Sequence, residues 1–184
     1  ADELPITEQA PLKEPESPYG NTKKVGERII KDTCSANKSL NAIALRYFNP
    51  IGAHKSANIG ELPIGTPQNL VPFVTQTGIG LREKLSIFGN DYPTPDGTCI
   101  RDYIHVVDLA KAHVIAMNRL LEENNTDNYE IYNIGTGKGS SVLEVVNTFE
   151  EVSGIELNYS FAPRRKGDII SAYADTTKAN SILG

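Results

Sequence analysis

The sequence predicts an α/β fold, in which short apolar runs typical of strands alternate along the chain with amphipathic stretches typical of helices. Two further observations support this class. Residues 41–48 (NAIALRYF) form an apolar run that ends at Asn49-Pro50, which is typical of a buried parallel strand. The chain has 184 residues and is 39% hydrophobic, which is enough for one domain with a hydrophobic core.

The individual elements follow from local signals. Residues 1–17 carry three prolines and several acids without periodicity, so we expect an ordered loop there. Pro18 suits the first turn of a helix, and Val25, Ile29 and Ile30 in that helix should bury one face. The predicted elements are helices at 19–36, 68–82, 106–122 and 140–152 and strands at 41–48, 85–88, 130–134 and 157–161.

The helix at 106–122 has the clearest pattern in the chain. Asp108 lies in its first turn, where a negative charge interacts favourably with the helix dipole. Its apolar residues recur at spacings of three and four, as they do on one face of an amphipathic helix. These residues are Val106, Ala110, Val114, Met117 and Leu121.

Composition excludes several classes of protein. The formal net charge of -5 and the pI near 5.2, without basic stripes, argue against nucleic-acid and anionic-membrane partners. No signal peptide or apolar run of membrane-spanning length is present. Cys34 and Cys99 form no Cys-x-x-Cys pair, which favours a reducing cytoplasm. The spacing of His54, His105 and His113 does not suit a metal site, so we expect no metal and structural roles for all three.

Tyr19-Gly20-Asn21-Thr22-Lys23 is the strongest chemical motif. Four residues span just over one helical turn, so the phenol and the ammonium should project from the same face. A free phenol ionises near pH ~10, and an adjacent cation lowers the free energy needed to use it as a base near neutrality. The pair alone could equally lie on a solvated helix face.

The segment Gly135-Thr136-Gly137-Lys138-Gly139-Ser140 follows a predicted strand and opens a predicted helix, which is the context that a phosphate-binding loop requires. Its spacing is Gly-x-Gly-x-Gly rather than Gly-x-Gly-x-x-Gly, and no Walker pattern fits. We therefore interpret this segment as a tight structural turn, which leaves the chain without a convincing dinucleotide fingerprint.

Five sequence blocks, taken together and in order, resemble one family. The blocks are Tyr19-x-x-x-Lys23, LRYFNPIG at 45–52, IFGNDY at 87–92, RDYIHV at 101–106 and APRRKGD at 162–168. They resemble the UDP-glucose 4-epimerase branch of the extended short-chain dehydrogenases and cover nearly the whole chain. The Tyr-x-x-x-Lys motif alone would indicate only the superfamily, whereas IFGNDY and RDYIHV narrow the resemblance to the epimerases.

The resemblance implies a C-terminal fragment. Family members begin with a Rossmann half that carries a Gly-x-x-Gly-x-x-Gly loop and a catalytic serine, and residue 1 matches a point just after that serine. The family also continues beyond Gly184. The expected fold is the last parallel strands and helices of an NAD-binding Rossmann-like domain plus a small mixed α/β substrate domain. Residues 1–50 would end the first domain and 51–184 would mostly form the second, with 101–135 returning to the first.

The resemblance also implies roles for individual residues. Tyr19 would remove the proton from the sugar 4-hydroxyl while NAD receives the C4 hydride, and Lys23 would hold the cofactor ribose. Tyr47 and Phe48 would contact the cofactor or lie in the strand core. Arg164 would engage an acidic neighbour or face solvent. The implied substrate residues are Asn49, Asn69 and Leu70 around the sugar and diphosphate, Ser86 and Phe88 at the uracil, Arg101 and Arg165 on the diphosphate, Tyr103 nearby and Asp168 on the uridine ribose.

Counting along the family pattern places Ala172 beside the sugar 2-position. A small residue there implies that N-acetylated UDP-sugars are also accepted. The intact protein is expected to be a homodimer, with the helix of Tyr19 helping to pair the subunits.

Two other interpretations stay open. The chain as it stands could be a UDP-sugar-binding module without catalytic activity, because the cofactor half is missing. It could also come from another nucleotide-sugar enzyme, a dehydratase or decarboxylase, although the surroundings of Tyr19 lack the extra acid and base that those reactions require.

Overall fold

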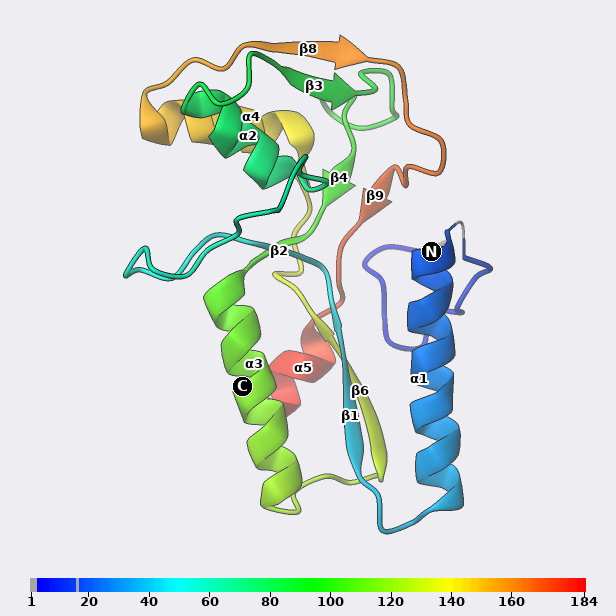
Figure 1. The fold of residues 1–184 in the computed structure, drawn as a ribbon. Coiled ribbons are helices and arrows are strands. Elements are labelled where there is room, and N and C mark those ends of the chain that lie inside the picture. Colours follow the sequence, from blue (N-terminus) through cyan, green and yellow to red (C-terminus); the bar gives the residue numbers. More distant parts are fainter. Residues whose placement is uncertain (1–2, 16) are drawn as a thin grey trace.

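The structure is a computed structural model that describes residues 3–15 and 17–184. It confirms the α/β class, because helices and strands alternate along most of the chain (Figure 1). The helices are α1 (Pro18–Ala36), α2 (Leu70–Gly78), α3 (Val106–Leu121), α4 (Val142–Ser153) and α5 (Thr177–Ile182). The strands are β1 (Ala42–Tyr47), β2 (Asn49–Ile51), β3 (Leu85–Phe88), β4 (Ile100–Arg101), β5 (Tyr103–His105), β6 (Tyr129–Ile134), β7 (Ser140–Ser141), β8 (Tyr159–Ala162) and β9 (Ser171–Ala172).

Most strand pairs are parallel. β1 and β6 pair along their full lengths, from Ala42 opposite Tyr129 to Tyr47 opposite Ile134. β2 pairs with β5, and β3 pairs with β8, both in parallel. β4 is the central strand of a three-stranded sheet, with β7 antiparallel on one side and β9 parallel on the other. Parallel pairs need crossover connections, and helices provide most of them here.

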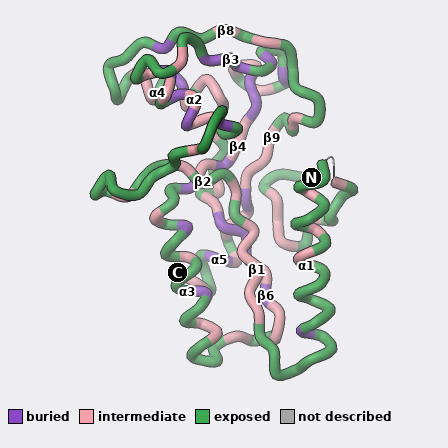
Figure 2. The backbone as a smooth tube through the Cα atoms, in the orientation of Figure 1, coloured by how far each residue is buried: buried purple, intermediate pink, exposed green. Residues whose placement is uncertain are grey.

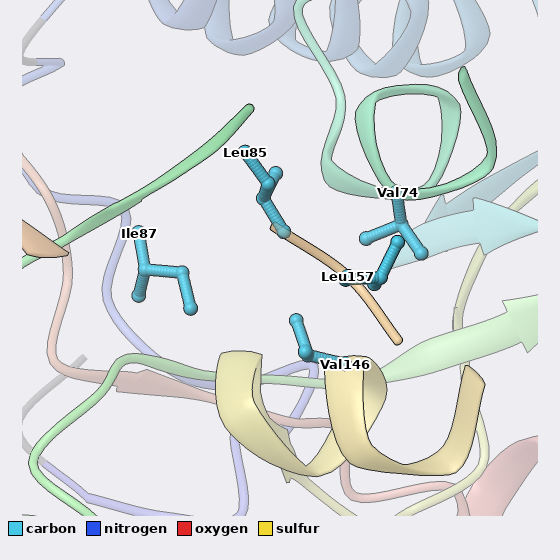
Figure 3. Packing of buried hydrophobic residues seen from close by; sticks show 5 residues of the cluster. All are labelled: Val74, Leu85, Ile87, Val146 and Leu157. Carbon is cyan, nitrogen blue, oxygen red and sulfur yellow. The ribbon is translucent and has the colours of Figure 1, made fainter. Parts of the chain in front are cut away.

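The chain has two separate hydrophobic clusters, one in each of two parts of the molecule that lie above and below the crossing segments in the view of Figures 1 and 2. We call the end that contains α2, β3, α4 and β8 the upper body, and the end that contains α1, β1, α3, β6 and α5 the lower body. Figure 3 shows the five buried residues of the upper cluster, which are Val74, Leu85, Ile87, Val146 and Leu157. The buried residues of the lower cluster are Ile104, Leu109, Tyr132, Ile134 and Ala179.

The chain passes between the two bodies four times. The first crossing contains β2, the second contains β4 and β5, the third runs from the end of β6 through β7, and the fourth contains β9 (Figure 1). These strands have only two or three residues each, and their sheets lie where the crossings meet. The sequence did not predict them, because so short a segment carries no detectable period.

Side-chain caps fix where two helices begin. Pro18 occupies the first turn of α1, as predicted, and the Ser17 hydroxyl accepts a hydrogen bond from the Gly20 amide at 3.1 Å. At α4 the Ser141 hydroxyl accepts from the Glu144 amide at 3.0 Å, and the Glu144 carboxylate accepts from the Ser141 amide. This reciprocal pair is a capping box, and it starts α4 at Val142 rather than at the predicted residue 140.

The helix predicted at 68–82 is shorter at both ends. It begins at Leu70, because Asn69 is its N-cap and has an extended backbone conformation. It ends at Gly78, and Gly80 follows with a φ of +76°, a left-handed conformation that stops the helix.

The prediction that α1 buries the face carrying Val25, Ile29 and Ile30 is wrong for the described chain. All three side chains are exposed, Ile29 by 59%, and Cys34 is the buried residue of the helix. Among the strands and helices, α1 packs mainly along β1 and β6, and two strands are too narrow to cover more than one side of a helix.

The helix predicted at 106–122 forms as α3, but its buried face differs from the expected one. Leu109 and Ala116 are buried, whereas Val114, Met117 and Leu121 are exposed. α3 carries apolar residues on more than one side, so the pattern alone cannot identify the side that packs on the sheet.

A buried ion pair joins α3 to β6 in the lower body. The Arg119 guanidinium donates to both carboxylate oxygens of Glu130, at 2.8 and 2.9 Å, and the Thr126 amide and the Tyr132 hydroxyl donate to the same carboxylate. These hydrogen bonds outweigh desolvation and lower the pKa of Glu130 to about 2. The pair therefore stays ionised at neutral pH.

Candidate active site

A cleft between the two bodies gathers most of the predicted substrate residues. It has a volume of about 290 Å³, near the lower limit of roughly 300 Å³ for small-molecule sites. Its wall is formed by β2, the start of α2, β3, β4 and β5, together with Arg165 and Asp168. The predicted residues that line it are Asn49, Asn69, Leu70, Ser86, Phe88, Arg101, Tyr103, Arg165 and Asp168.

Strand alternation explains which side chains of the second crossing line the cleft. Successive side chains of an extended chain point to opposite sides, so Cys99, Arg101 and Tyr103 share one side and all three line the cleft. The two residues between them, Ile100 and Asp102, do not line it, and Asp102 is fully buried. The segment thus places its polar cleft side chains two residues apart.

Asp168 lies between two guanidinium groups. Arg165 donates to its two carboxylate oxygens from Nε at 3.1 Å and from Nη2 at 3.3 Å. Arg101 Nη2 lies 3.8 Å from Asp168 Oδ1, and Arg101 Nη1 also donates to the Ile169 carbonyl at 2.6 Å. Both guanidiniums are therefore held in place beside the cleft without a ligand.

Charged residues of the cleft favour an anion. The three cations Lys84, Arg101 and Arg165 face the two carboxylates of Glu61 and Asp168, so the lining carries one net positive charge in a chain whose net charge is -5. Arginine forks suit diphosphate oxygens, because each can donate two parallel hydrogen bonds.

Aromatic groups provide the remaining recognition elements. The Arg165 guanidinium lies 4.8 Å from the centroid of the Phe88 ring, which fixes that ring as a stacking surface at the cleft. Burial raises the pKa of Tyr103, although Arg101 partly opposes this. The Tyr103 phenol is therefore neutral at pH 7 and can donate a hydrogen bond.

Arg164 does not line the cleft and belongs to a neighbouring cluster with Asp91 and Tyr92. Its Nε donates to Asp91 Oδ1 at 2.7 Å, and its guanidinium lies 4.1 Å from the Tyr92 ring centroid. The hydrogen bond from Arg164 lowers the pKa of Asp91, and burial raises the pKa of Tyr92. Of the two expectations for Arg164, engagement of an acidic neighbour is the one observed.

Tyr19 and Lys23 lie on α1, outside the residues that line the cleft. The Lys23 ammonium is 5.1 Å from the centroid of the Tyr19 ring, so the two groups share one side of the helix, as the spacing predicted. Tyr19 is 71% exposed. A ligand could therefore reach both groups from solvent.

The other expected cofactor residues lie at the end of β1. Tyr47 is exposed and its ring centroid is 6.0 Å from that of His113 on α3. Phe48 is half-buried, and its amide donates to the Ile134 carbonyl at 3.1 Å. Neither residue lines the cleft.

Ala172 is the one expected substrate residue that does not line the cleft. It lies on β9 opposite Arg101 of β4 and is half-buried. Its carbonyl accepts a hydrogen bond from the Asp102 amide at 3.0 Å. Ala172 is thus adjacent to a cleft residue through the backbone ladder.

The glycine-rich segment after β6 uses its amides within the protein. The Thr136 amide donates to Asp102 Oδ1 at 2.8 Å, and the Gly137 amide donates to Asp102 Oδ2 at 3.1 Å. Gly135 must lack a side chain, because an added Cβ would collide with the Asp102 carboxylate. These contacts support the interpretation as a structural turn.

Sequence reasoning missed several residues of the lining. Cys99 could have been found from its spacing of two from Arg101, and Ile87 lies within a predicted strand between two expected residues. The loop residues carried no such signal. The missed residues include Pro50, Ile51, Glu61, Gln68, Val71, Phe73, Lys84, Leu85, Ile87, Cys99 and Val142.

The described residues contain no group of three or more His, Cys, Asp or Glu side chains that could hold a metal ion. All three histidines bond to nearby groups in the chain. His54 Nδ1 lies 2.8 Å from Ser56 Oγ, His105 Nδ1 accepts from the Val107 amide at the start of α3, and His113 Nδ1 lies 2.8 Å from the Leu109 carbonyl oxygen. Within residues 3–15 and 17–184, no helix combines the length and apolar character needed to cross a bilayer.

Comparisons with known proteins identify the family of this chain. The sequence model of the NAD dependent epimerase/dehydratase family matches residues 1–135. The UDP-glucose 4-epimerase of Bacillus subtilis is 53% identical over 180 residues, which are 98% of this chain and 52% of that protein. The chain thus spans about half the length of the curated relatives it matches.

Two solved structures share the fold. A UDP-glucose 4-epimerase from Stenotrophomonas maltophila, with bound NAD and formylated UDP-arabinopyranose, superposes with a TM-score of 0.95 at 45% identity, over 100% of this chain and 54% of that chain. One from Bifidobacterium longum, in complex with NAD+ and UDP, gives a TM-score of 0.93 at 46% identity, over 100% and 53%. The resemblance inferred from the five sequence blocks is confirmed, and the chain belongs to the NAD dependent epimerase/dehydratase family.

Proposed function

We propose that the protein interconverts UDP-glucose and UDP-galactose with NAD as its cofactor. In this proposal the chain supplies the UDP-sugar cleft and the Tyr19–Lys23 pair. The observation that carries it is the cleft, where Arg101 and Arg165 are held on both sides of Asp168 next to Phe88. The relatives support it, because they are named UDP-glucose 4-epimerases and one is in complex with NAD+ and UDP.

The cleft residues divide the substrate into a firmly held part and a free part. Arg101 and Arg165 bind the diphosphate by charge-assisted hydrogen bonds. Ser86 and Phe88 frame the uracil, and Asp168 accepts from the uridine ribose. Asn49, Asn69 and Leu70 contact the sugar less tightly, which lets the hexose turn over while the nucleotide stays bound.

The chain's own residues suit the nicotinamide end of NAD, because α1 presents a phenol and an ammonium on one accessible side. When bound, NAD would accept a hydride from the sugar and return it. Tyr19 removes the proton from the 4-hydroxyl, and Lys23 binds the ribose and favours the tyrosinate electrostatically. Tyr47 and Phe48 contact the cofactor. The glycine-rich turn after β6 is not part of this site, because its Thr136 and Gly137 amides donate hydrogen bonds to the Asp102 carboxylate.

The test is epimerase activity of the full-length protein that contains this chain. Tyr19→Phe should lower kcat by about 10²-fold or more, the upper part of the range for general acid–base catalysis, while UDP affinity measured by calorimetry stays within about twofold. The chain alone should bind UDP but show no turnover. Wild-type full-length protein that binds UDP without any turnover would instead indicate a binding module.

The same assay tests substrate breadth. We propose that the protein also interconverts UDP-GlcNAc and UDP-GalNAc, because Ala172 is small and adjacent to Arg101. Full-length protein that turns over UDP-galactose but not UDP-GlcNAc would remove this part of the proposal.

We also propose the domain division expected from the sequence, with 101–135 returning to the domain of residues 1–50. The lower cluster supports it, since Ile104 and Ile134 pack there with Leu45. Ala179 of α5 packs in the same cluster, so α5 would join this domain.

The free thiols of Cys34 and Cys99 support a cytoplasmic location.

A homodimer paired through α1 is the proposed assembly. The exposed apolar side chains of Val25, Ile29 and Ile30 on α1 support it. Light scattering of the full-length protein measures the assembly directly, and a monomer at micromolar concentration would contradict it.

A further inference from the structure

The four crossings between the two bodies meet at one buried residue, Asp102. Its exposure is 0%, and it separates β4 from β5, so it lies at the point where the second crossing passes from one sheet to another. Asp102 lies outside the cleft lining, although its neighbours Arg101 and Tyr103 line the cleft. Its carboxylate points to the opposite side from theirs.

The backbone of Asp102 binds two of the other crossings. Its amide donates to the Ala172 carbonyl on the fourth crossing at 3.0 Å. Its carbonyl accepts from the Asn49 amide on the first crossing at 2.9 Å. These two hydrogen bonds do not depend on the side chain, so any residue other than proline could make them at this position.

The carboxylate of Asp102 accepts hydrogen bonds from the third crossing and from the fourth crossing. On the third crossing it accepts from the Thr136 amide, from the Thr136 hydroxyl at 2.7 Å and from the Gly137 amide. On the fourth crossing it accepts from the Ala174 amide at 3.1 Å. Four donors thus converge on one buried charge, and each hydrogen bond to an ionised group is among the stronger kinds in proteins.

We propose that Asp102 is a positioning residue that fixes the upper body relative to the lower body. This inference rests on the proposed function for its catalytic consequence. The upper body holds most of the groups proposed to bind UDP, and the lower body holds Tyr19 and Lys23. The sugar can meet Tyr19 only if the distance between the two bodies is set correctly. Asp102 acts on the reaction through this distance and touches neither substrate nor cofactor.

The geometry predicts a distinctive kinetic effect for Asp102→Asn in the full-length protein. The substituted amide has the same shape but replaces one acceptor oxygen with an NH2 group, which opposes the converging amides. We expect kcat to fall about tenfold or more, because small misplacements of reacting groups are costly. UDP affinity should change less than about threefold, since Ser86, Phe88 and Arg165 are held within the upper body.

Amide hydrogen exchange supplies a readout that does not depend on activity. The Asn49 amide bonds to the backbone carbonyl of residue 102, a contact that Asp102→Asn leaves intact. Faster exchange at Asn49 would therefore report that the bodies have loosened, rather than the simple loss of an acceptor. The exchange rate at Asn49 therefore tests whether Asp102 holds the two bodies together, and it does so independently of catalysis. If the wild-type protein shows no epimerase turnover, the proposed function fails but this test still stands.

Glu130→Gln is the matched control, because it also removes a buried carboxylate with several donors but lies within the lower body. It should lower the melting temperature without lowering kcat below about half at temperatures where the variant is folded. If Asp102→Asn does not fold, Thr136→Val replaces it, since this variant removes one donor to the carboxylate and should lower kcat about threefold. Unchanged kcat and unchanged exchange at Asn49 would overturn the inference, as would a loss of UDP affinity as large as the loss of kcat.

Discussion

The upper body and helix α1 differ in how completely they are packed. In the upper body two helices cover β3 and β8, and Leu85 is only 2% exposed. On α1, by contrast, the apolar residues Val25, Ile29 and Ile30 face solvent in the described chain. The groups proposed to bind UDP are therefore held by a closed core, whereas the proposed catalytic pair lies on a helix with an uncovered apolar side.

This difference teaches which part of the proposed activity the chain can support by itself. The cleft guanidiniums are already fixed by Asp168 and by backbone carbonyls. Tyr19 and Lys23 are close to each other but are not enclosed. In the proposed function, binding of the nucleotide uses the cleft residues of the upper body and of the crossings, and chemistry at the sugar also needs Tyr19 and Lys23 on α1.

The largest expected effect is a difference in the free energy of unfolding between a variant of the upper core and a variant of α1. Leu85→Ala should lower the free energy of unfolding by about 3 kcal/mol, because it opens a cavity in the upper cluster. Ile29→Ala should lower it by less than about 0.5 kcal/mol, because that side chain is mostly exposed. Urea unfolding of the chain, followed by circular dichroism, measures both. A similar loss for the two variants would show that α1 is packed more fully than described.

The next-largest effect concerns the pH dependence of stability that the Arg119–Glu130 ion pair of the lower body produces. The pKa of Glu130 is lowered from 4.5 to about 2, so its stabilisation, about 3 kcal/mol, is present above pH ~4.5 and is lost as the pH falls toward 2. Glu130→Gln should remove this dependence. Melting temperatures of both proteins between pH 2 and pH 7 give the test, and parallel curves would contradict it.

The smallest effect concerns the cleft itself. Arg165→Ala should weaken UDP binding about 30-fold, which corresponds to roughly 2 kcal/mol for a charge-assisted pair of hydrogen bonds. Arg164→Ala is the matched control, because Arg164 is next to Arg165 in sequence but bonds to Asp91, and neither Arg164 nor Asp91 lines the cleft. This variant should change UDP affinity less than about threefold. Calorimetric titration with UDP distinguishes them. Equal losses would mean that the arginine assignment is reversed or shared.

Much of the fold was predictable because its longer elements carry clear periods. The helix after Pro18 and the parallel strand after residue 41 were both found. The buried face of α3 was not, because Val114 and Met117 are as apolar as the residues that pack, and only the sheet decides which side is covered.

The candidate site was predictable where a motif carried it and not where distant segments meet. RDYIHV pointed to Arg101 and Tyr103, and both line the cleft. The role of Asp102 between them depends on Asn49, Gly137 and Ala174, which lie far away along the chain. No local pattern in the sequence records such a convergence.

The turn after β6 has a wider consequence for reading glycine-rich sequences. Its amides do bind an anion, as the Gly-x-Gly pattern suggests, but the anion is the carboxylate of Asp102. The chain therefore carries its own counterpart of a phosphate group, which is tethered within the fold and already occupies the Thr136 and Gly137 amides. A glycine-rich loop of this kind should be judged by whether an acidic side chain of the same fold can reach it, before a nucleotide is assigned to it.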